Sequence, residues 1–341
     1  MTFTGGFFGL ELPPVNPNGL ASFWGVPARS SLTYANARSA LAALLTSIRP
    51  NTLWLPAYIC RSVAQAAEAT ATPVRYFAVD ESLQPDTSAL QSAVRPGDMV
   101  LAVDYFGRPP GCAFLDFVAR RPDLVFVEDA CHAADTGVTQ WGRWCLRSPR
   151  KLVGVPDGGF IVPSAGISEA NGSESRPVLD AYEAAFLRFE DEEECCNPRW
   201  HEANQRREAT EQVSPRRMSR LTRELLERLA LGPIADKRHA NFRVLADMLD
   251  RYKYLPDKDP GFVPLGFPIR LRAALRDKVL TDLIAQGIFP AVHWRDLPSP
   301  AAFTTAHGLA TELLTLPCDQ RYEPIEMERI ARVLRETLNR Q

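Results

Sequence analysis

The sequence predicts an α/β protein, with helices covering both faces of a mostly parallel sheet and a smaller α+β unit after it. In the first half, short runs rich in β-branched and other apolar residues alternate with stretches of helical periodicity. Beyond residue 190 the pattern changes to a charged segment, and mixed helical and strand-like stretches follow it. These observations predict the order of a large sheet-based part and a smaller C-terminal part.

The strands of the predicted sheet are short apolar runs, as expected for strands buried on both faces. Two stretches between the first of them, residues 39–48 and 61–71, have helical spacing. In open α/β sheets ligands bind at the carboxyl ends of the strands, so residues directly after each strand are the first candidates for a site. The expected strands are residues 52–55, 74–79, 99–103, 124–127 and 159–162.

The charged stretch at residues 190–217 has no clear periodicity, and we expect it to be a long excursion between elements. After it, Met218, Leu221, Leu225, Leu226 and Leu229 fall on one helical face. A second helix is expected from Ala235.

The C-terminal unit combines a strand-like stretch at 264–271, a helix from Arg272 and a last helix with apolar residues at 330–338. A smaller α+β domain after a large α/β domain is the simplest organisation of this pattern. We therefore predict a large domain with an N-terminal arm at residues 1–235 and a small domain at residues 236–341.

Composition excludes several classes of function. The 341 residues are 45% hydrophobic and 23% charged, and the net charge of -2 provides no field that would attract nucleic acid or an anionic membrane. No apolar run is long enough to span a membrane, and the N-terminus does not resemble a signal peptide. The seven cysteines lack metal-binding spacing, and their odd number favours a reducing compartment. We predict a cytoplasmic protein without a metal site, with a small molecule as its partner.

A phosphate seat is predicted where the stretch YANARSALAALL enters a helix. Asn36, Ala37 and Arg38 lie at the start of this helix, where free backbone N–H groups and the positive end of the helix dipole attract anions. Small and polar residues at this position are also common as plain helix caps.

Two further segments carry a carboxylate and a lysine. In VEDACHA, Asp129 follows a strand and His132 comes three residues later; in SPRKLVGVPDGG, Lys151 shares a turn with Ser148 and Arg150. Singly, such a carboxylate is usually a turn former and a lone lysine is usually a surface residue. Together with the phosphate seat, they are the parts that hold pyridoxal phosphate. The carboxylate keeps the pyridine nitrogen protonated, and the lysine forms the Schiff base and later moves the proton.

From about Tyr34 to its C-terminus, the chain resembles the DegT/DnrJ/EryC1/StrS family, which are pyridoxal-phosphate-dependent sugar aminotransferases of fold type I. The resemblance rests on ordered motifs. NARSAL is similar to the family's phosphate-binding helix start, VLAVDYFGRPP to its HxYGxP segment, VEDACHA to its EDxAxA, and SPRKLVGVPDGG to its lysine motif. Downstream, RRMSRLTRELL is similar to the helix containing NYRMS, and GIFPAVHW to the GI...VHY turn.

The resemblance implies roles for individual residues. Lys151 would be the Schiff-base lysine, Asp129 the partner of the pyridinium nitrogen, and His132 a neighbour of the ring and its phenolic oxygen. The amides at the helix start, with Ser148, would bind the phosphate. A homodimer is also implied, because the active site of fold type I enzymes lies at a dimer interface.

The sequence signals for substrate-binding residues are less specific than those for the cofactor. The turn with His293 and Trp294 approaches the active-site entrance in the family, and small-domain packing is an equal alternative. Arg216 and Arg217 could bind a nucleotide diphosphate, although a basic helix start is commoner as a solvated surface.

Two positions depart from the family pattern. The ring-stacking aromatic residue of the family falls on Cys60, so stacking is missing or moves to Tyr58. The asparagine that reaches the phosphate from the neighbouring subunit falls on Pro215, which has no side-chain donor. Ser214, Arg216 or Arg217 would have to replace it.

The resemblance implies an aminotransferase that moves an amino group from a donor, expected to be glutamate, to a keto group, expected to belong to a nucleotide-linked sugar. A lysine at position 151 favours transamination, because histidine replaces it in a dehydratase branch of the family. Two alternatives stay open. One is another pyridoxal phosphate reaction, such as dehydration or racemisation; the other is a binding or regulatory protein without catalysis.

Overall fold

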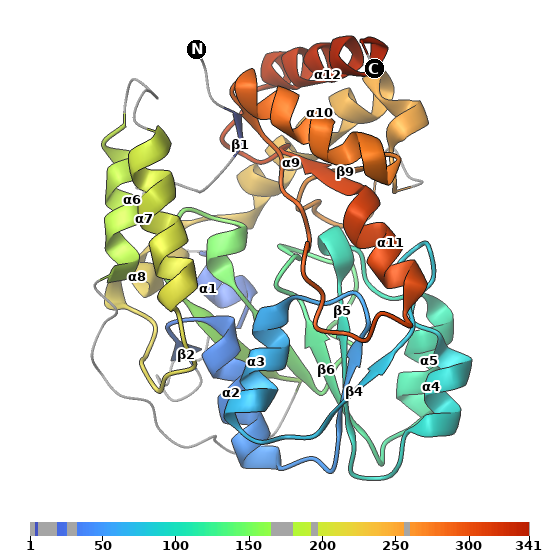
Figure 1. The fold of residues 1–341 in the computed structure, drawn as a ribbon. Coiled ribbons are helices and arrows are strands. Elements are labelled where there is room, and N and C mark those ends of the chain that lie inside the picture. The colour runs from blue at the N-terminus through green and yellow to red at the C-terminus, as the bar shows by residue number, and fades with distance from the viewer. Residues whose placement is uncertain are drawn as a thin grey trace.

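The fold was analysed in a computed structural model, which describes residues 4–5, 19–25, 33–164, 180–191, 197–255 and 260–340. At its centre lies a seven-stranded sheet of order β2-β8-β7-β6-β5-β3-β4 (Figure 1). Strands β3 to β7 pair in parallel, whereas β8 runs antiparallel to both β7 and β2. The strands are β2 (Thr33–Tyr34), β3 (Leu53–Pro56), β4 (Val74–Phe77), β5 (Met99–Val103), β6 (Val125–Asp129), β7 (Trp144–Arg147) and β8 (Gly159–Pro163).

The sheet confirms the predicted α/β class with mostly parallel strands. All five predicted apolar runs form strands of it, and β5 is buried along its whole length. Such burial on both faces explains why MVLAV is continuously apolar rather than alternating. Strand β7 was not predicted, because the short run WCLR lies between polar turn residues.

Helices pack around this sheet and against one another (Figure 1). Helix α2 contacts α3, β7 and β8, and α4 contacts α5. Helices α2 and α3 match the predicted helical stretches, whereas α4 and α5 were not predicted. The helices of this part are α1 (Leu20–Phe23), α2 (Ala37–Ile48), α3 (Arg61–Ala69), α4 (Thr87–Ala93) and α5 (Cys112–Arg120), with short 3-10 helices η2 (Tyr105–Gly107) and η3 (Pro149–Lys151).

The predicted excursion at residues 190–217 is wrong in part, because it contains helix α7 (Asn197–Thr210). This helix packs against α6 (Asp180–Phe189). Its few apolar residues explain why no periodicity was visible: Trp200 and Ala203 are buried, and the rest of the contact includes the Arg206–Glu183 ion pair at 3.0 Å.

Helix α8 (Arg220–Arg228) begins where Asp157 anchors its N-cap residue. The Asp157 carboxylate accepts hydrogen bonds from the Ser219 backbone N–H at 2.9 Å and from the Ser219 hydroxyl at 2.8 Å. Helix α9 (Leu231–Met248) starts four residues before the predicted Ala235. Pro233 lies in its first turn, where a missing N–H costs nothing.

The C-terminal unit contains a small antiparallel sheet of β9 (Phe267–Arg270) and β11 (Leu313–Leu316). In a separate two-stranded sheet, β1 (Thr4–Gly5) pairs in parallel with β10 (Ile288–Phe289). Since α9 crosses the predicted boundary between residues 235 and 236, the two-domain division stays a prediction. The remaining elements are η4 (Asp250–Tyr252), α10 (Ala273–Ala285), α11 (Thr304–Glu312) and α12 (Pro324–Asn339).

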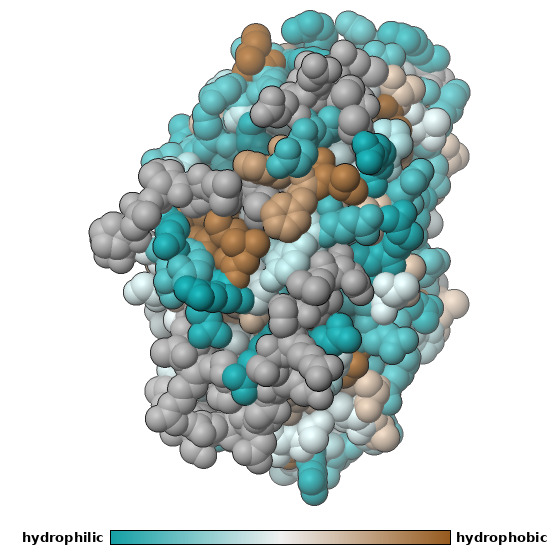
Figure 2. Space-filling model, turned by 90° about the vertical axis from the view of Figure 1, so that its left-hand side faces the viewer, coloured by the Kyte–Doolittle hydropathy of each residue, from teal (hydrophilic) through white to brown (hydrophobic). Residues whose placement is uncertain are grey.

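Figure 2 views the side that lies on the left in Figure 1, where α6 and α7 stand. Hydrophobic residues gather near the middle of this face, with hydrophilic residues around them (Figure 2). Phe186 and Phe189 of α6 are 45% and 42% exposed. Within the part of the chain that the structure describes, no helix is long and apolar enough to cross a membrane.

Candidate active site

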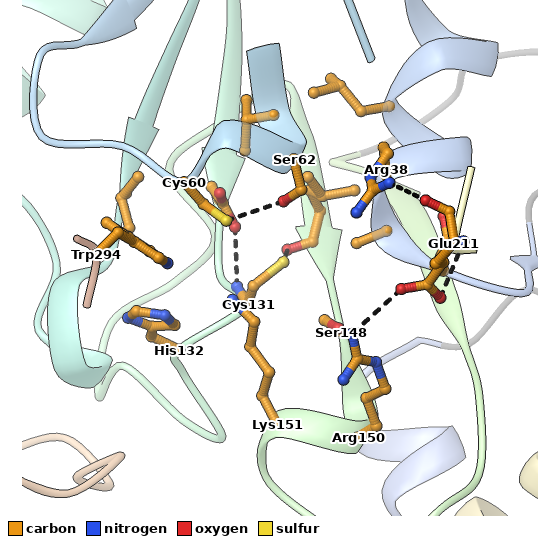
Figure 3. A pocket seen from close by; sticks show the side chains of 17 residues that line it. Arg38, Cys60, Ser62, Cys131, His132, Ser148, Arg150, Lys151, Glu211 and Trp294 are labelled. Atoms are coloured by element: carbon orange, nitrogen blue, oxygen red, sulfur yellow. Dashed lines mark hydrogen bonds and ion pairs between the residues drawn. The ribbon is translucent and has the colours of Figure 1, made fainter. Parts of the chain in front are cut away.

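A cleft of about 590 Å³ opens where β5 and β6 end and α2 begins. It brings together residues that lie more than 100 positions apart in the sequence, as expected for the carboxyl edge of a parallel sheet. Figure 3 shows the side chains that converge on it. The predicted residues Asn36, Ala37, Arg38, Asp129, His132, Ser148, Lys151 and Trp294 all line this cleft.

The lysine sits in a 3-10 turn between β7 and the chain leading to β8. The Lys151 backbone N–H donates to the Ser148 carbonyl at 3.1 Å, which closes this turn. From there the half-buried Lys151 side chain extends into the cleft toward Cys131 (Figure 3). The turn therefore presents an amine to the edge of the sheet.

The Pro-Asp-Gly-Gly step after the lysine joins three parts of the site. A Cβ atom at Gly159 would lie 2.0 Å from the Ala37 backbone nitrogen, so only glycine allows β8 to pack directly on the start of α2. Gly158 has φ +116° and donates to the Ala35 carbonyl at 2.7 Å. Asp157 anchors α8, as described above. This step therefore fixes the phosphate seat relative to the lysine turn.

Asp129 is the last residue of β6 and is 5% exposed. One of its carboxylate oxygens, Oδ1, accepts a hydrogen bond from the Cys131 N–H at 3.1 Å. Cys131 is buried and also lines the cleft.

Two histidines and a tryptophan form one wall of the cleft. His132 packs nearly parallel to Trp294, with ring centroids 5.5 Å apart, and its centroid lies 5.0 Å from that of His293. Burial, together with the charge of Lys151, lowers the pKa of His132 well below its usual range and that of His293 to about 3. Both imidazoles are therefore neutral at pH 7.

The start of α2 is the predicted phosphate seat. The Asn36 side-chain oxygen caps the helix by accepting from the Ser39 N–H at 2.8 Å. Arg38, Ser148 and Arg150 reach the same part of the cleft (Figure 3). Glu211 also lines it, and its carboxylate is bound by the Asn36 amide at 3.1 Å. Sequence reasoning missed Glu211, because nothing near it in the chain marks it as a site residue.

The departures from the family pattern have specific places in the structure. Cys60 lines the cleft, and its sulfur accepts a hydrogen bond from the Ser62 hydroxyl at 3.1 Å. Tyr58 is fully buried against Trp294, with ring centroids 5.3 Å apart, and so lies behind the wall of the cleft. The aromatic ring exposed beside Cys60 is that of Trp294 (Figure 3).

The predicted substrate residues divide into two groups. His293 and Trp294 line a wide hollow of about 1560 Å³ that continues from the cleft toward the C-terminal unit. Arg216 is exposed at a separate hollow that shares Asn36 and Glu211 with the cleft. Arg217 lies near Tyr34 and lowers the pKa of that phenol, against the larger effect of burial. The role of both arginines stays a prediction.

The sheet order, with its antiparallel strand β8, and the cleft at its carboxyl edge define the type I fold of pyridoxal-phosphate-dependent transferases, as predicted. Solved aminotransferase structures share this fold. DesV from S. venezuelae is 20% identical with a TM-score of 0.66, covering 89% of this chain and 84% of its own. NtdA from Bacillus subtilis with bound cofactor PMP is 17% identical with a TM-score of 0.67, covering 99% and 78%. Helicobacter pylori PseC, an aminotransferase involved in the biosynthesis of pseudoaminic acid, is 16% identical with a TM-score of 0.67, covering 94% and 90%.

The sequence comparison finds a family resemblance in part of the chain. The model of the DegT/DnrJ/EryC1/StrS aminotransferase family matches residues 18–151. This segment includes the phosphate seat, Asp129, His132 and the lysine turn, so the resemblance predicted from the motifs is confirmed there. None of the curated protein sequences searched matches the chain.

Proposed function

We propose that the protein is a pyridoxal-phosphate-dependent aminotransferase. It would move an amino group from a donor, with glutamate as the first candidate, to a keto group of a nucleotide-linked sugar. The observation that carries this proposal is the convergence of Lys151, Asp129 and His132 on one cleft with the start of α2. The family match over residues 18–151 supports the same reaction class.

The residues present fit the cofactor. Neither ring nitrogen of the 1% exposed His132 has a hydrogen-bond partner among the residues that the structure describes, although His132 lines the cleft. A polar ligand in the cleft would complete the hydrogen bonding of this buried imidazole. Gly159 packs closely on the start of α2, and Ala37 and Arg38 in its first turn line the same cleft. Both features agree with a phosphorylated aromatic ligand.

When bound, pyridoxal phosphate supplies a ring that withdraws electrons from the bonds of an attached amine. Asp129 would keep the pyridine nitrogen protonated, and His132 would hydrogen-bond to the phenolic oxygen. The N–H groups of Ala37 and Arg38, with Ser148, would hold the phosphate. Lys151 would hold the cofactor and move the proton during amino transfer.

Trp294 would provide the flat aromatic surface that Cys60 lacks. Its indole lines the cleft beside Cys60 and is held in place by His132 and Tyr58, which pack against it. An aromatic wall at this place also excludes water from the reacting atoms. The sequence left this stacking either missing or moved to Tyr58, and Trp294 would take its place.

The hollow of about 1560 Å³ beside the cleft supports a large acceptor. Its lining includes Lys151, His293 and Arg321. Among the structures with this fold, DesI has been solved in the presence of its TDP-sugar product. A nucleotide-linked sugar would fit a hollow of this size.

We also propose that the protein is a cytoplasmic homodimer. The exposed Phe186 and Phe189 on α6 support contact with a second copy, because large exposed apolar residues favour burial in an interface. Cys60, Cys112 and Cys131 are among the free cysteines, which suits a reducing compartment.

Trapping with borohydride tests the proposed function. Purified protein is incubated with pyridoxal phosphate, reduced, and mapped by peptide mass. The cofactor should attach to Lys151, the visible absorbance band should bleach on adding glutamate, and Lys151→Ala should abolish attachment and turnover. Unchanged turnover in Lys151→Ala would refute the catalytic assignment. Binding of the cofactor without any attachment at Lys151 in the wild type would favour the alternative of a binding or regulatory protein.

A further inference from the structure

Glu211 places a carboxylate in the predicted phosphate seat. Its Oε1 atom accepts a hydrogen bond from the Asn36 side-chain amide at 3.1 Å, and its Oε2 atom pairs with Arg150 at 3.4 Å. Arg207, in the last turn of α7, lies 3.5 Å from Oε1. Arg38 donates a hydrogen bond to the backbone carbonyl oxygen of Glu211. In Figure 3 Glu211 lies between Arg38 and Arg150.

These groups are the ones that a phosphate ester would need. The side chains of Glu211 and Arg150 are only 15% and 17% exposed, and that of Arg207 is 5% exposed. At such burial, water screens charges weakly. A phosphate dianion at the start of α2 would therefore meet strong repulsion from an ionised Glu211 and would compete with it for the same donors.

We propose that Glu211 is a tethered competitor for the phosphate seat, which a phosphorylated cofactor must displace. Before the cofactor binds, the carboxylate balances the charges of Arg150 and Arg207 and keeps the seat ordered. On binding, the phosphate takes over these donors, and the Glu211 side chain moves out of the seat. This inference rests on the proposed function, because it takes the cofactor phosphate as the displacing anion.

Glu208, in the last turn of α7 and three residues before Glu211, provides a matched control. It pairs with the same two arginines, at 3.4 Å from Arg150 and 3.5 Å from Arg207. Its side chain is 52% exposed, and it does not appear among the residues that line the cleft at the start of α2. Glu208→Gln therefore alters the same ion-pair network but leaves the Glu211 carboxylate in the phosphate seat.

The test compares the wild type, Glu211→Gln and Glu208→Gln with two probes. Pyridoxal phosphate and pyridoxal both carry the aldehyde that reacts with a lysine, but only the first carries the phosphate. Dissociation constants are measured by absorbance titration, and borohydride trapping reports attachment at Lys151. Glu211→Ala is measured as a second variant, because it removes the side chain rather than its charge alone.

We expect Glu211→Gln to bind pyridoxal phosphate about tenfold or more tightly than the wild type, since a repulsive charge has been removed. Its affinity for pyridoxal should be unchanged. Glu208→Gln should change the affinity for pyridoxal phosphate by less than about fivefold, as for an exposed ion pair. Glu211→Ala should shift affinity in the same direction as Glu211→Gln.

Several results would overturn the proposal. Equal or weaker binding of pyridoxal phosphate by both Glu211 variants, with attachment at Lys151 intact, would refute the role of Glu211 and leave the proposed function standing. An equal gain for pyridoxal would show that the effect does not act through the phosphate. Absence of attachment at Lys151 in every protein, including the wild type, would refute the proposed function and this inference with it.

Discussion

At the scale of single residues, the surroundings of His293 keep its imidazole neutral. Its Nδ1 atom lies 3.1 Å from the Thr315 hydroxyl, and its ring packs against Phe106 and His132. Burial and then the charge of Lys151 lower its pKa to about 3. The imidazole can therefore act as a hydrogen-bonding group at the hollow without adding a charge near the lysine.

This pKa makes stability depend on pH. An unfolded histidine titrates near pH 6.5, so below that pH the unfolded state binds more protons than the folded state. The contribution of the neutral His293 to the free energy of unfolding is fully present above about pH 6.5 and is lost as the pH drops toward about 3. We expect the wild type to lose roughly 1 to 2 kcal/mol more than His293→Asn between pH 7 and pH 5.

Urea unfolding at pH 7, 6 and 5 measures this difference. Asparagine keeps an amide that can reach the Thr315 hydroxyl but cannot titrate, which makes it the suitable replacement. Identical losses in the two proteins would mean that His293 is protonated as readily in the folded state as in the unfolded chain.

Individual site residues were predictable where the chain itself marked them. Asp129 ends a strand, Lys151 lies in a polar turn, and Ala37 opens a helix, so each is visible in a local pattern. Glu211 could not be found this way, because Asn36 and Arg150, which bind its carboxylate, are 175 and 61 residues away in the chain. Only the folded arrangement reveals that contact.

At the scale of elements, the ends of β5 and β6 share a buried pair of acids. Asp104 follows β5 and is 0% exposed, and Glu128 in β6 is 1% exposed. Glu128 accepts hydrogen bonds from the backbone N–H groups of Trp141 and Gly142 at 2.9 and 3.2 Å, whereas Asp104 accepts one from the Trp141 indole at 3.2 Å. Burial and the charge of Glu128 raise the pKa of Asp104 well above its usual range.

Asp104 therefore carries the proton of the pair, and asparagine should imitate it. A folded-state pKa above the unfolded value of about 3.9 favours folding at low pH, and this advantage is lost as the pH rises through the folded pKa. At low pH we expect the free energy of unfolding of Asp104→Asn to lie within about 1 kcal/mol of that of the wild type. As the pH rises, the variant should become more stable relative to the wild type.

Chemical unfolding from pH 5 to pH 8 follows this difference. A variant that is several kcal/mol less stable at every pH would show that Asp104 is ionised in the folded protein. Glu128→Gln is the control, since it weakens the hydrogen bonds of Trp141 and Gly142 and should destabilise at all these pH values.

Elements were predictable in proportion to their apolar content. Strands β3 and β5 are continuous buried apolar runs, and helices α2 and α3 bury enough apolar residues to give a helical period. Helix α7 does not, because Trp200 and Ala203 provide most of its apolar burial and ion pairs such as Arg206–Glu183 complete its contact with α6. Contacts of that kind depend on a partner helix and leave no periodic pattern.

At the scale of the whole molecule, Arg238 of α9 joins the C-terminal unit to the lysine turn. It is 0% exposed, and its guanidinium donates hydrogen bonds to the carbonyl oxygens of Leu152 at 2.9 Å, Pro264 at 2.9 Å and Leu265 at 2.8 Å. The Gln320 side-chain oxygen accepts a fourth at 2.8 Å. A planar fork of donors suits such a junction, which a lysine cannot reproduce.

Because Leu152 follows Lys151 directly, this junction links the overall packing to the site. We expect Arg238→Met, which keeps the apolar stem and removes the donors, to lower the free energy of unfolding by about 3 kcal/mol or more, since the carbonyl groups of Pro264 and Leu265 lose this donor. Pyridoxal phosphate should also bind more weakly, because the lysine turn loses its support.

Arg243→Met, at an exposed position of the same helix, should change the free energy of unfolding by less than about 0.5 kcal/mol. Urea unfolding measures the change in stability of both variants, and cofactor titration measures the change in affinity. If Arg238→Met lost stability but kept its cofactor affinity, the lysine turn would be held by its own contacts with β7 and β8.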